Sequence, residues 1–143
     1  SVKDWLTMAD RVVVDGAGWS GDGLSGLVAM ATLPGRFDVE IADFALIRQT
    51  RWREAIASTF DRPAMLPCLT HIDRVDICYA ARDGTPGMTN VVKPVYHAAW
   101  LASRLGMAVA FHGSIADRFH HPSQDREVPV AIVDTITGTQ PKH

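Results

Sequence analysis

Hydrophobic and polar residues alternate along this chain with two periods, one typical of strands and the other of helices. Short β-branched or alternating runs predict strands at residues 11–15, 37–41, 72–80, 107–113 and 128–133. Apolar residues spaced three or four apart predict helices at residues 24–33, 43–60 and 91–105, with a short helix within residues 2–9. The polar residues 114–127 predict a loop or an insertion. Because strands alternate with helices, we expect an α/β layered domain whose mostly parallel or mixed sheet has about four to five strands flanked by helices.

The helix expected at residues 43–60 has the most informative pattern. Its apolar members, among them Phe44, Ile47 and Ile56, recur every three or four residues and form one stripe. Asp43 is suited to cap this helix, because its carboxylate can accept a hydrogen bond from an amide of the first turn. Its first part, residues 43–54, contains no residue suited to be a nucleophile.

The amino-acid composition argues against several classes of protein, among them nucleic-acid-binding, membrane-spanning and disulfide-rich proteins. Apolar residues make up 47% of the chain and charged residues 21%, which fits one soluble domain over residues 1–143, and both ends of the pattern suggest a fragment of a longer protein. A net charge of −2 without a lysine run gives no reason to expect nucleic acid, and no apolar run is long enough to span a membrane. Two cysteines are too few for a disulfide scaffold, so we expect a cytoplasmic protein. Cys68 and Cys78 are interpreted either as a redox pair or as structural thiols.

Candidate catalytic and metal-ligating residues are few. His71 and Asp73 share one face of an expected strand, and together with His97 or His112 they suggest a pocket, which makes an uncharacterised enzyme a third hypothesis. A zinc site needs three or four ligands, and the chain offers no close cluster of them, so we expect no metal. No Gly-x-Ser-x-Gly elbow is present, and we predict neither a catalytic residue nor a cofactor.

A glycine-rich loop supports an alternative function. Gly16, Gly18 and Gly21 follow an expected strand with the spacing of a dinucleotide-binding turn, and Asp43 lies near the place of a ribose-binding acid. The alternative is therefore a nucleotide- or phosphosugar-binding α/β domain. Two details oppose it, because Asp43 leads straight into a helix that its carboxylate can cap, and Trp19 is bulky where a cofactor should approach the backbone. The other interpretation is a flexible loop between a strand and a helix.

Arginine and tryptophan crowd the start of the long expected helix. Arg48, Arg51, Trp52 and Arg53 combine wide flat surfaces with directed donors, which are the properties of side chains that anchor interfaces. We therefore predict that these four residues bind a partner, with Trp52 structural in part. The alternative is a solvated helix face, on which arginines commonly contribute nothing specific.

Three motifs carry a family resemblance. They are residues 9–15 (Ala-Asp-Arg-Val-Val-Val-Asp), 43–54 (Asp-Phe-Ala-Leu-Ile-Arg-Gln-Thr-Arg-Trp-Arg-Glu) and 100–106 (Trp-Leu-Ala-Ser-Arg-Leu-Gly). In this order they resemble the glucose-6-phosphate dehydrogenase assembly protein family, OpcA. The family's helix typically reads Asp-Leu-Asn-Trp-x-Arg-Leu-Thr-Pro-Trp-Arg-Glu, where this chain has Ala45, Leu46 and Arg51 in place of the asparagine, the first tryptophan and the proline.

The resemblance implies a non-catalytic accessory protein. Such a protein would bind glucose-6-phosphate dehydrogenase, help its oligomers assemble or shift it toward an active state, and so serve the oxidative pentose phosphate pathway. An effector of this kind is allosteric, because it shifts the population by its different affinities for two states of the enzyme. The resemblance names one protein partner and leaves the oligomeric state of this chain open.

Overall fold

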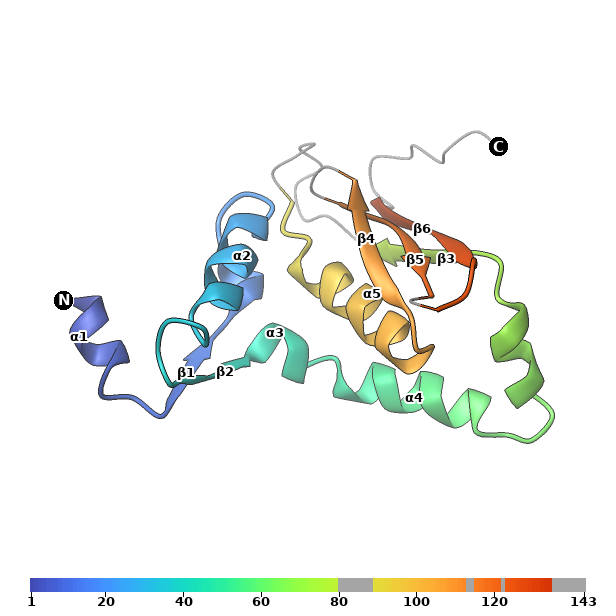
Figure 1. Ribbon diagram of the computed structural model, residues 1–143, viewed down its shortest axis with the longest axis horizontal. Coiled ribbons are helices and arrows are strands. Elements are labelled where there is room, and N and C mark those ends of the chain that lie inside the picture. Colours follow the sequence, from blue (N-terminus) through green and yellow to red (C-terminus); the bar gives the residue numbers. More distant parts are fainter. Residues whose placement is uncertain (80–88, 113–114, 122, 135–143) are drawn as a thin grey trace.

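The computed structural model describes residues 1–79, 89–112, 115–121 and 123–134 of the chain (Figure 1). Its elements are α1 (Val2–Leu6), β1 (Arg11–Val14), the 3-10 helix η1 (Gly16–Gly18), α2 (Leu24–Thr32), β2 (Glu40–Asp43), α3 (Phe44–Ile47), α4 (Thr50–Phe60), the 3-10 helix η2 (Leu66–His71), β3 (Val75–Tyr79), α5 (Val92–Arg104), β4 (Ala108–His112), β5 (Ile115–His120) and β6 (Glu127–Asp134). Within these residues no helix has both the length and the apolar character needed to cross a bilayer.

The strands form two sheets. β1 and β2 pair in parallel as a two-stranded sheet, with Arg11 opposite Glu40 and Val14 opposite Asp43. The second sheet has four strands in the order β3-β6-β5-β4, in which β3 is parallel to β6 while β5 is antiparallel to both of its neighbours. Helices and a mixed four-stranded sheet confirm the α/β class expected from the sequence.

The hydrophobic core lies between α5 and the four-stranded sheet (Figure 1). Ala98 and Ala102 of α5 are buried against Phe119 of β5 and Val128 of β6, and their small side chains let the helix approach the sheet closely. Burying a side chain such as Phe119 contributes about 1.5–3 kcal/mol. The helix ends before Gly106, whose φ of 66° lies in the left-handed region that favours glycine.

Three expectations about the elements are corrected. The single helix expected at residues 43–60 is two helices, α3 and α4, and the strand expected at residues 37–41 is displaced to β2. The loop expected at residues 114–127 contains β5, an interior strand of the sheet. β5 escapes detection because half of its residues are polar and they do not alternate regularly with the apolar ones, and pairing on both edges holds it in the sheet.

A buried carboxylate joins the first sheet to α5. Asp43 is only 4% exposed, and its Oδ1 accepts hydrogen bonds from the Gly16 amide at 2.9 Å and the Ala45 amide at 2.8 Å. The Tyr96 hydroxyl of α5 donates to Asp43 Oδ2 at 2.7 Å. The bond to Ala45 confirms the predicted helix cap, now at the start of α3. Asn90 strengthens the same junction by donating from Nδ2 to the Gly16 carbonyl at 2.8 Å.

We predict that Asp43→Ala destabilises the chain by about 3 kcal/mol, because it removes a helix cap and leaves other buried donors without an acceptor. Tyr96→Phe removes one of the three bonds and should cost about 1 kcal/mol. Urea unfolding of both variants measures the two free energies. A loss for Asp43→Ala no larger than that for Tyr96→Phe would contradict the assigned role of the carboxylate.

Candidate functional site

Arg53 forms hydrogen bonds across the break between α3 and α4. Its Nη1 donates to the Leu46 carbonyl at 2.9 Å, and its Nη2 donates to Thr50 Oγ1 at 3.0 Å. The Thr50 hydroxyl in turn donates to the Ile47 carbonyl at 2.7 Å. The Ile47 carbonyl near the end of α3 thus gains a donor, and the Leu46 carbonyl, which already accepts from the Gln49 amide at 3.2 Å, gains a second one. The half-buried Arg53 therefore positions α4, a role that its sequence neighbourhood did not indicate.

Arg48 is also engaged within the chain. Its guanidinium pairs with Asp15 Oδ2 at 2.7 Å and lies over the Phe44 ring, 5.6 Å from the ring centre. Both members of the ion pair are substantially exposed, so the pair itself contributes little to stability. Arg48 and Phe44 together present a flat surface at the start of the α3–α4 segment.

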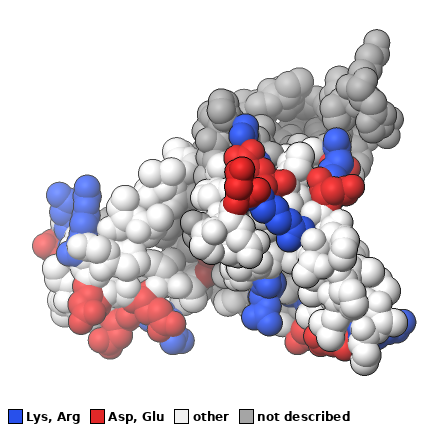
Figure 2. All heavy atoms as spheres, turned by 45° about the vertical axis from the view of Figure 1, so that its right-hand side comes forward, with Lys and Arg blue, Asp and Glu red and all other residues white. Residues whose placement is uncertain are grey.

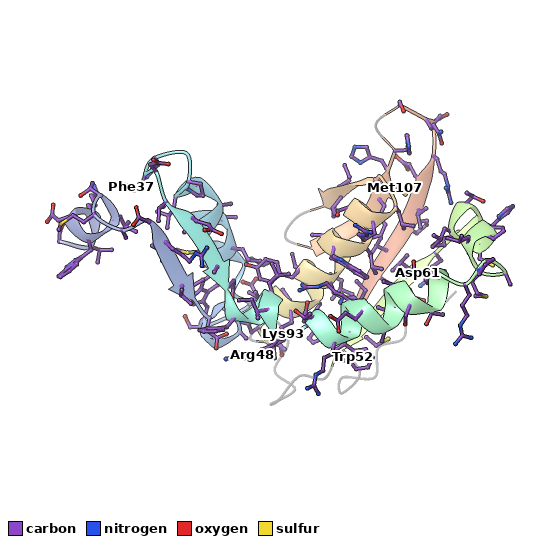
Figure 3. The ribbon with its side chains drawn as sticks, turned by 90° about the horizontal axis from the view of Figure 1, so that it is seen from below. Phe37, Arg48, Trp52, Asp61, Lys93 and Met107 are labelled. Carbon is purple, nitrogen blue, oxygen red and sulfur yellow. The ribbon has the colours of Figure 1, made fainter. Side chains whose placement is uncertain are left out.

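Arg51 and Trp52 extend from α4 into solvent. Trp52 is 70% exposed, which is unusual for so large an apolar side chain. Figure 3 shows Trp52 and Arg48 along the same margin of the chain. No residue of α4 is buried, so the apolar stripe of this amphipathic helix is incompletely covered. Of the four predicted partner-binding residues, Arg48, Arg51 and Trp52 are exposed, whereas Arg53 is half-buried.

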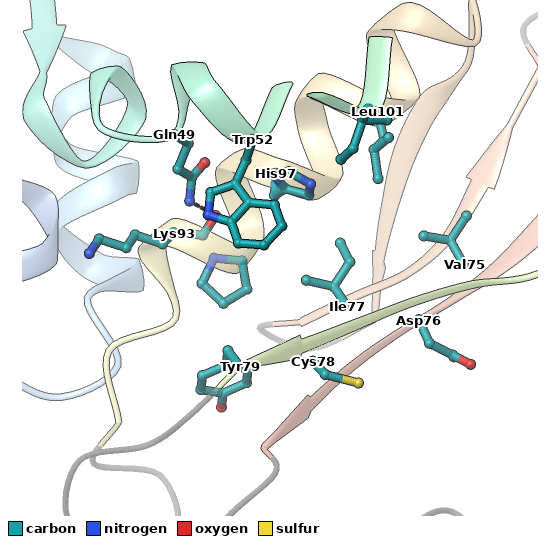
Figure 4. A pocket seen from close by; sticks show the side chains of 12 residues that line it. Gln49, Trp52, Val75, Asp76, Ile77, Cys78, Tyr79, Lys93, His97 and Leu101 are labelled. Atoms are coloured by element: carbon teal, nitrogen blue, oxygen red, sulfur yellow. Dashed lines mark hydrogen bonds between the residues drawn. The ribbon is translucent and has the colours of Figure 1, made fainter. Parts of the chain in front are cut away.

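Trp52 also borders an open cleft of about 470 Å³ between α4, α5 and β3 (Figure 4). Apolar side chains predominate in its lining, which consists of Gln49, Trp52, Ile56, Val75, Asp76, Ile77, Cys78, Tyr79, Lys93, Pro94, His97 and Leu101. Gln49 ties the two helices at one end, because its Nε2 donates to the Lys93 carbonyl at 2.8 Å. The sequence did not reveal this cleft, since its lining comes from three segments that are far apart in the chain.

His97 occupies the middle of the cleft's helical wall (Figure 4). Its ring is tilted by 44° against Trp100, with the ring centres 5.8 Å apart. Burial, and then the nearby positive charge of Arg53, lowers the pKa of His97 below its usual value. The imidazole is therefore neutral at pH 7 and presents a flat, weakly polar surface.

Gly16 is the closely packed residue of the three glycines in the Gly16–Gly21 turn. A Cβ on Gly16 would lie 2.6 Å from Asp43 Oδ2 and 2.8 Å from Val92 Cγ1, so only glycine fits there. Gly18 and Gly21 both have open space around them, and Gly21 has a φ of 63°. Because the Gly16 amide and the Asp43 carboxylate bind each other, a phosphate or ribose would have to displace these bonds. The geometry gives the nucleotide-binding alternative no support at these residues.

The histidine hypothesis gains no support either. His71 lies at the end of η2, where its Nδ1 contacts the Pro67 carbonyl at 2.9 Å, and it does not line the cleft that holds His97. Asp73 is exposed, and the side chain of His112 lies outside the described residues. The described part of the chain holds no group of three potential metal ligands.

Cys68 and Cys78 are both free and exposed, so neither is a buried structural thiol. The exposed charges of the described residues form small groups of both signs on the face that Figure 2 shows, rather than one basic band. Arg11 with Glu40 and Arg118 with Glu127 are examples of such pairs.

Comparison with known proteins identifies the chain. Residues 39–141 match the family described as the C-terminal domain of the glucose-6-phosphate dehydrogenase subunit OpcA. The chain belongs to this OpcA family. The match contains two of the three motifs, residues 43–54 and 100–106, while the motif at residues 9–15 precedes it. A search of curated proteins found no match. The OpcA match thus covers β2 through β6, including α4 and the cleft.

The lowered pKa of His97 predicts acid sensitivity. The folded state binds this proton less readily than the unfolded state, so the contribution of His97 to stability is complete above about pH 6.5 and is lost as the pH falls below it. His97→Gln removes the titrating group. Between pH 7.5 and pH 5.5, the urea midpoint of the wild type should therefore fall further than that of the variant. Equal falls would show that His97 titrates alike in both states.

Proposed function

We propose that this chain is a non-catalytic accessory factor of glucose-6-phosphate dehydrogenase, which binds the enzyme and helps its oligomers assemble or favours its active state. Membership of a family named for a subunit of that dehydrogenase supports this role. Activation follows if the chain binds the active state more tightly, because the population then shifts by the difference in affinity. The role serves NADPH production in the oxidative pentose phosphate pathway and requires no catalytic residue on this chain.

The observation that carries the proposal is the accessible side of α3 and α4. We define the docking surface as Phe44, Ile47, Arg48, Arg51 and Trp52, all of which are exposed. Exposed apolar side chains that gather beside arginines mark interaction sites, and tryptophan and arginine are the residues that most often dominate binding energy. Arg53 acts indirectly by holding α4 in place.

We predict that Trp52→Ala and Arg51→Ala each weaken binding to the dehydrogenase of the same organism by about tenfold to a hundredfold, as expected for residues central to an interface. Both side chains are exposed, so neither change should alter folding. Calorimetric titration gives the dissociation constants, and dehydrogenase turnover with and without the chain gives the functional effect.

Trp5→Ala and Arg36→Ala are matched controls. Each removes an exposed side chain of the same type from residues that precede the family match. The controls should bind like the wild type. If the Trp52 and Arg51 variants also bind like the wild type, the docking surface is assigned wrongly, whereas a wild-type chain that does not bind at all contradicts the accessory role itself.

A further inference from the structure

The cleft between α4, α5 and β3 has the size and the lining of a small-molecule site (Figure 4). Its volume of about 470 Å³ lies within the range of about 300–1,000 Å³ that is usual for ligand pockets. Such pockets are mainly apolar and hold a few polar groups that orient the ligand. Here Ile56 and Leu101 come from the two helices and Ile77 comes from β3, so three elements build one apolar space.

Flat side chains form much of the wall of this cleft. Figure 4 shows the Trp52 ring of α4 across the cleft from Ile77 and Tyr79 of β3, with the His97 ring of α5 beside it. Trp52 is 70% exposed, so a ligand can reach its ring. Burial and the charge of Arg53 lower the pKa of His97, which keeps this ring uncharged at pH 7. Flat, weakly polar surfaces favour a ligand whose body is itself flat and mainly apolar.

The charges of the cleft select the sign of the ligand. Lys93 lies at one end, is exposed, and forms no ion pair with any other residue that the structure describes. Asp76 lies toward the other end in Figure 4 and is already paired, because the Nε of Arg74 donates to its carboxylate at 2.9 Å. Of the charges on the described lining residues, the positive one at Lys93 is therefore left unmatched, and this favours an anion.

Gln49 makes the same end of the cleft polar. Its Nε2 is used by the Lys93 carbonyl, to which it donates at 2.8 Å. Its Oε1 is buried and accepts no hydrogen bond within the described ranges of the chain. A buried acceptor without a partner is uncommon in folded proteins and calls for an explanation. The Gln49–Lys93 end is thus the part of the cleft where the polar group of a ligand fits best.

We propose that this cleft binds a small aromatic carboxylate, with the flat apolar body between Trp52 and β3 and the carboxylate at the Lys93 end. Lys93 then donates a charge-assisted hydrogen bond, which is stronger than one between neutral groups. The aromatic body gains its affinity from apolar area removed from water. This binding site goes beyond the accessory function proposed above and does not depend on it.

An NMR titration of the full chain with two matched probes tests the proposal. The probes are 2-naphthoate and 2-naphthamide, which share one flat body and differ in charge. Proton–nitrogen correlation spectra should show saturable shifts of the Trp52 indole N–H, the Gln49 side-chain amide and the backbone amides of the cleft. We expect naphthoate to bind about tenfold more tightly than naphthamide, as one hydrogen bond to a charged group predicts.

Each result of the titration decides one part of the proposal. Saturable shifts at the cleft with the expected preference for naphthoate support it. No saturable shift at millimolar probe, or shifts confined to exposed apolar residues elsewhere such as Trp5 and Val28, overturns the site. Equal affinities for the two probes overturn the anionic class of ligand. If the same resonances shift when the chain alone is concentrated, a second copy is the occupant and the proposal is wrong. None of these measurements involves the dehydrogenase, so a failure here leaves the accessory function standing.

A pair of lysine variants provides an independent check. Lys93→Gln removes the charge at the end of the cleft, whereas Lys3→Gln removes an exposed charge from α1, outside the cleft lining. We expect Lys93→Gln to weaken naphthoate binding about tenfold and to leave naphthamide binding unchanged, while Lys3→Gln changes neither. The correlation spectra without probe report whether both variants keep the fold. A folded Lys93→Gln chain that binds naphthoate like the wild type would contradict the assigned orientation of the ligand and overturn the proposal.

Discussion

The buried Asp43 carboxylate is the constraint on which the arrangement of this chain depends. A carboxylate removed from water must be matched by donors, and here they come from the loop after β1, from the first turn of α3 and from α5. Gly16 has to be glycine so that its amide can approach the carboxylate. Burial, followed by the adjacent Asp43, raises the pKa of the Tyr96 hydroxyl, which therefore remains a donor over the physiological range. One side chain thus joins the first sheet to the second half of the chain.

The bond between Asp43 and the Ala45 amide fixes where α3 begins, and further hydrogen bonds fix the position of α4. Arg53 of α4 donates a hydrogen bond to the Leu46 carbonyl of α3, and Gln49 at the start of α4 donates one to the Lys93 carbonyl of α5. α4 is therefore held at one end by polar bonds instead of by a fully buried face. Its apolar stripe remains available to the cleft and to solvent, with Trp52 at the boundary between them. A helix held in this way supports the proposed role in binding another protein.

Local signals in the sequence predicted much of the fold. Periodicity placed α2, α5, β3, β4 and β6 to within a few residues, while capping chemistry identified Asp43. The break before α4 was missed because the apolar spacing continues across it. The family's proline at the position of Arg51 is the available signal, since proline is favoured in the first turn of a helix. The cleft and the pair of Arg48 with Asp15 depend on tertiary contacts that no local pattern encodes. The bonds of Arg53 are local, but they form across the break between α3 and α4 that the apolar spacing did not reveal.

The central claim is that this chain works by docking on glucose-6-phosphate dehydrogenase. Sedimentation velocity of the dehydrogenase from the same organism, with and without an excess of the chain, tests it most directly. The account predicts that part of the chain sediments with the dehydrogenase in a fixed ratio and that the distribution of dehydrogenase oligomers shifts toward larger or more uniform species. Two independent boundaries, with the oligomer distribution unchanged, would contradict it.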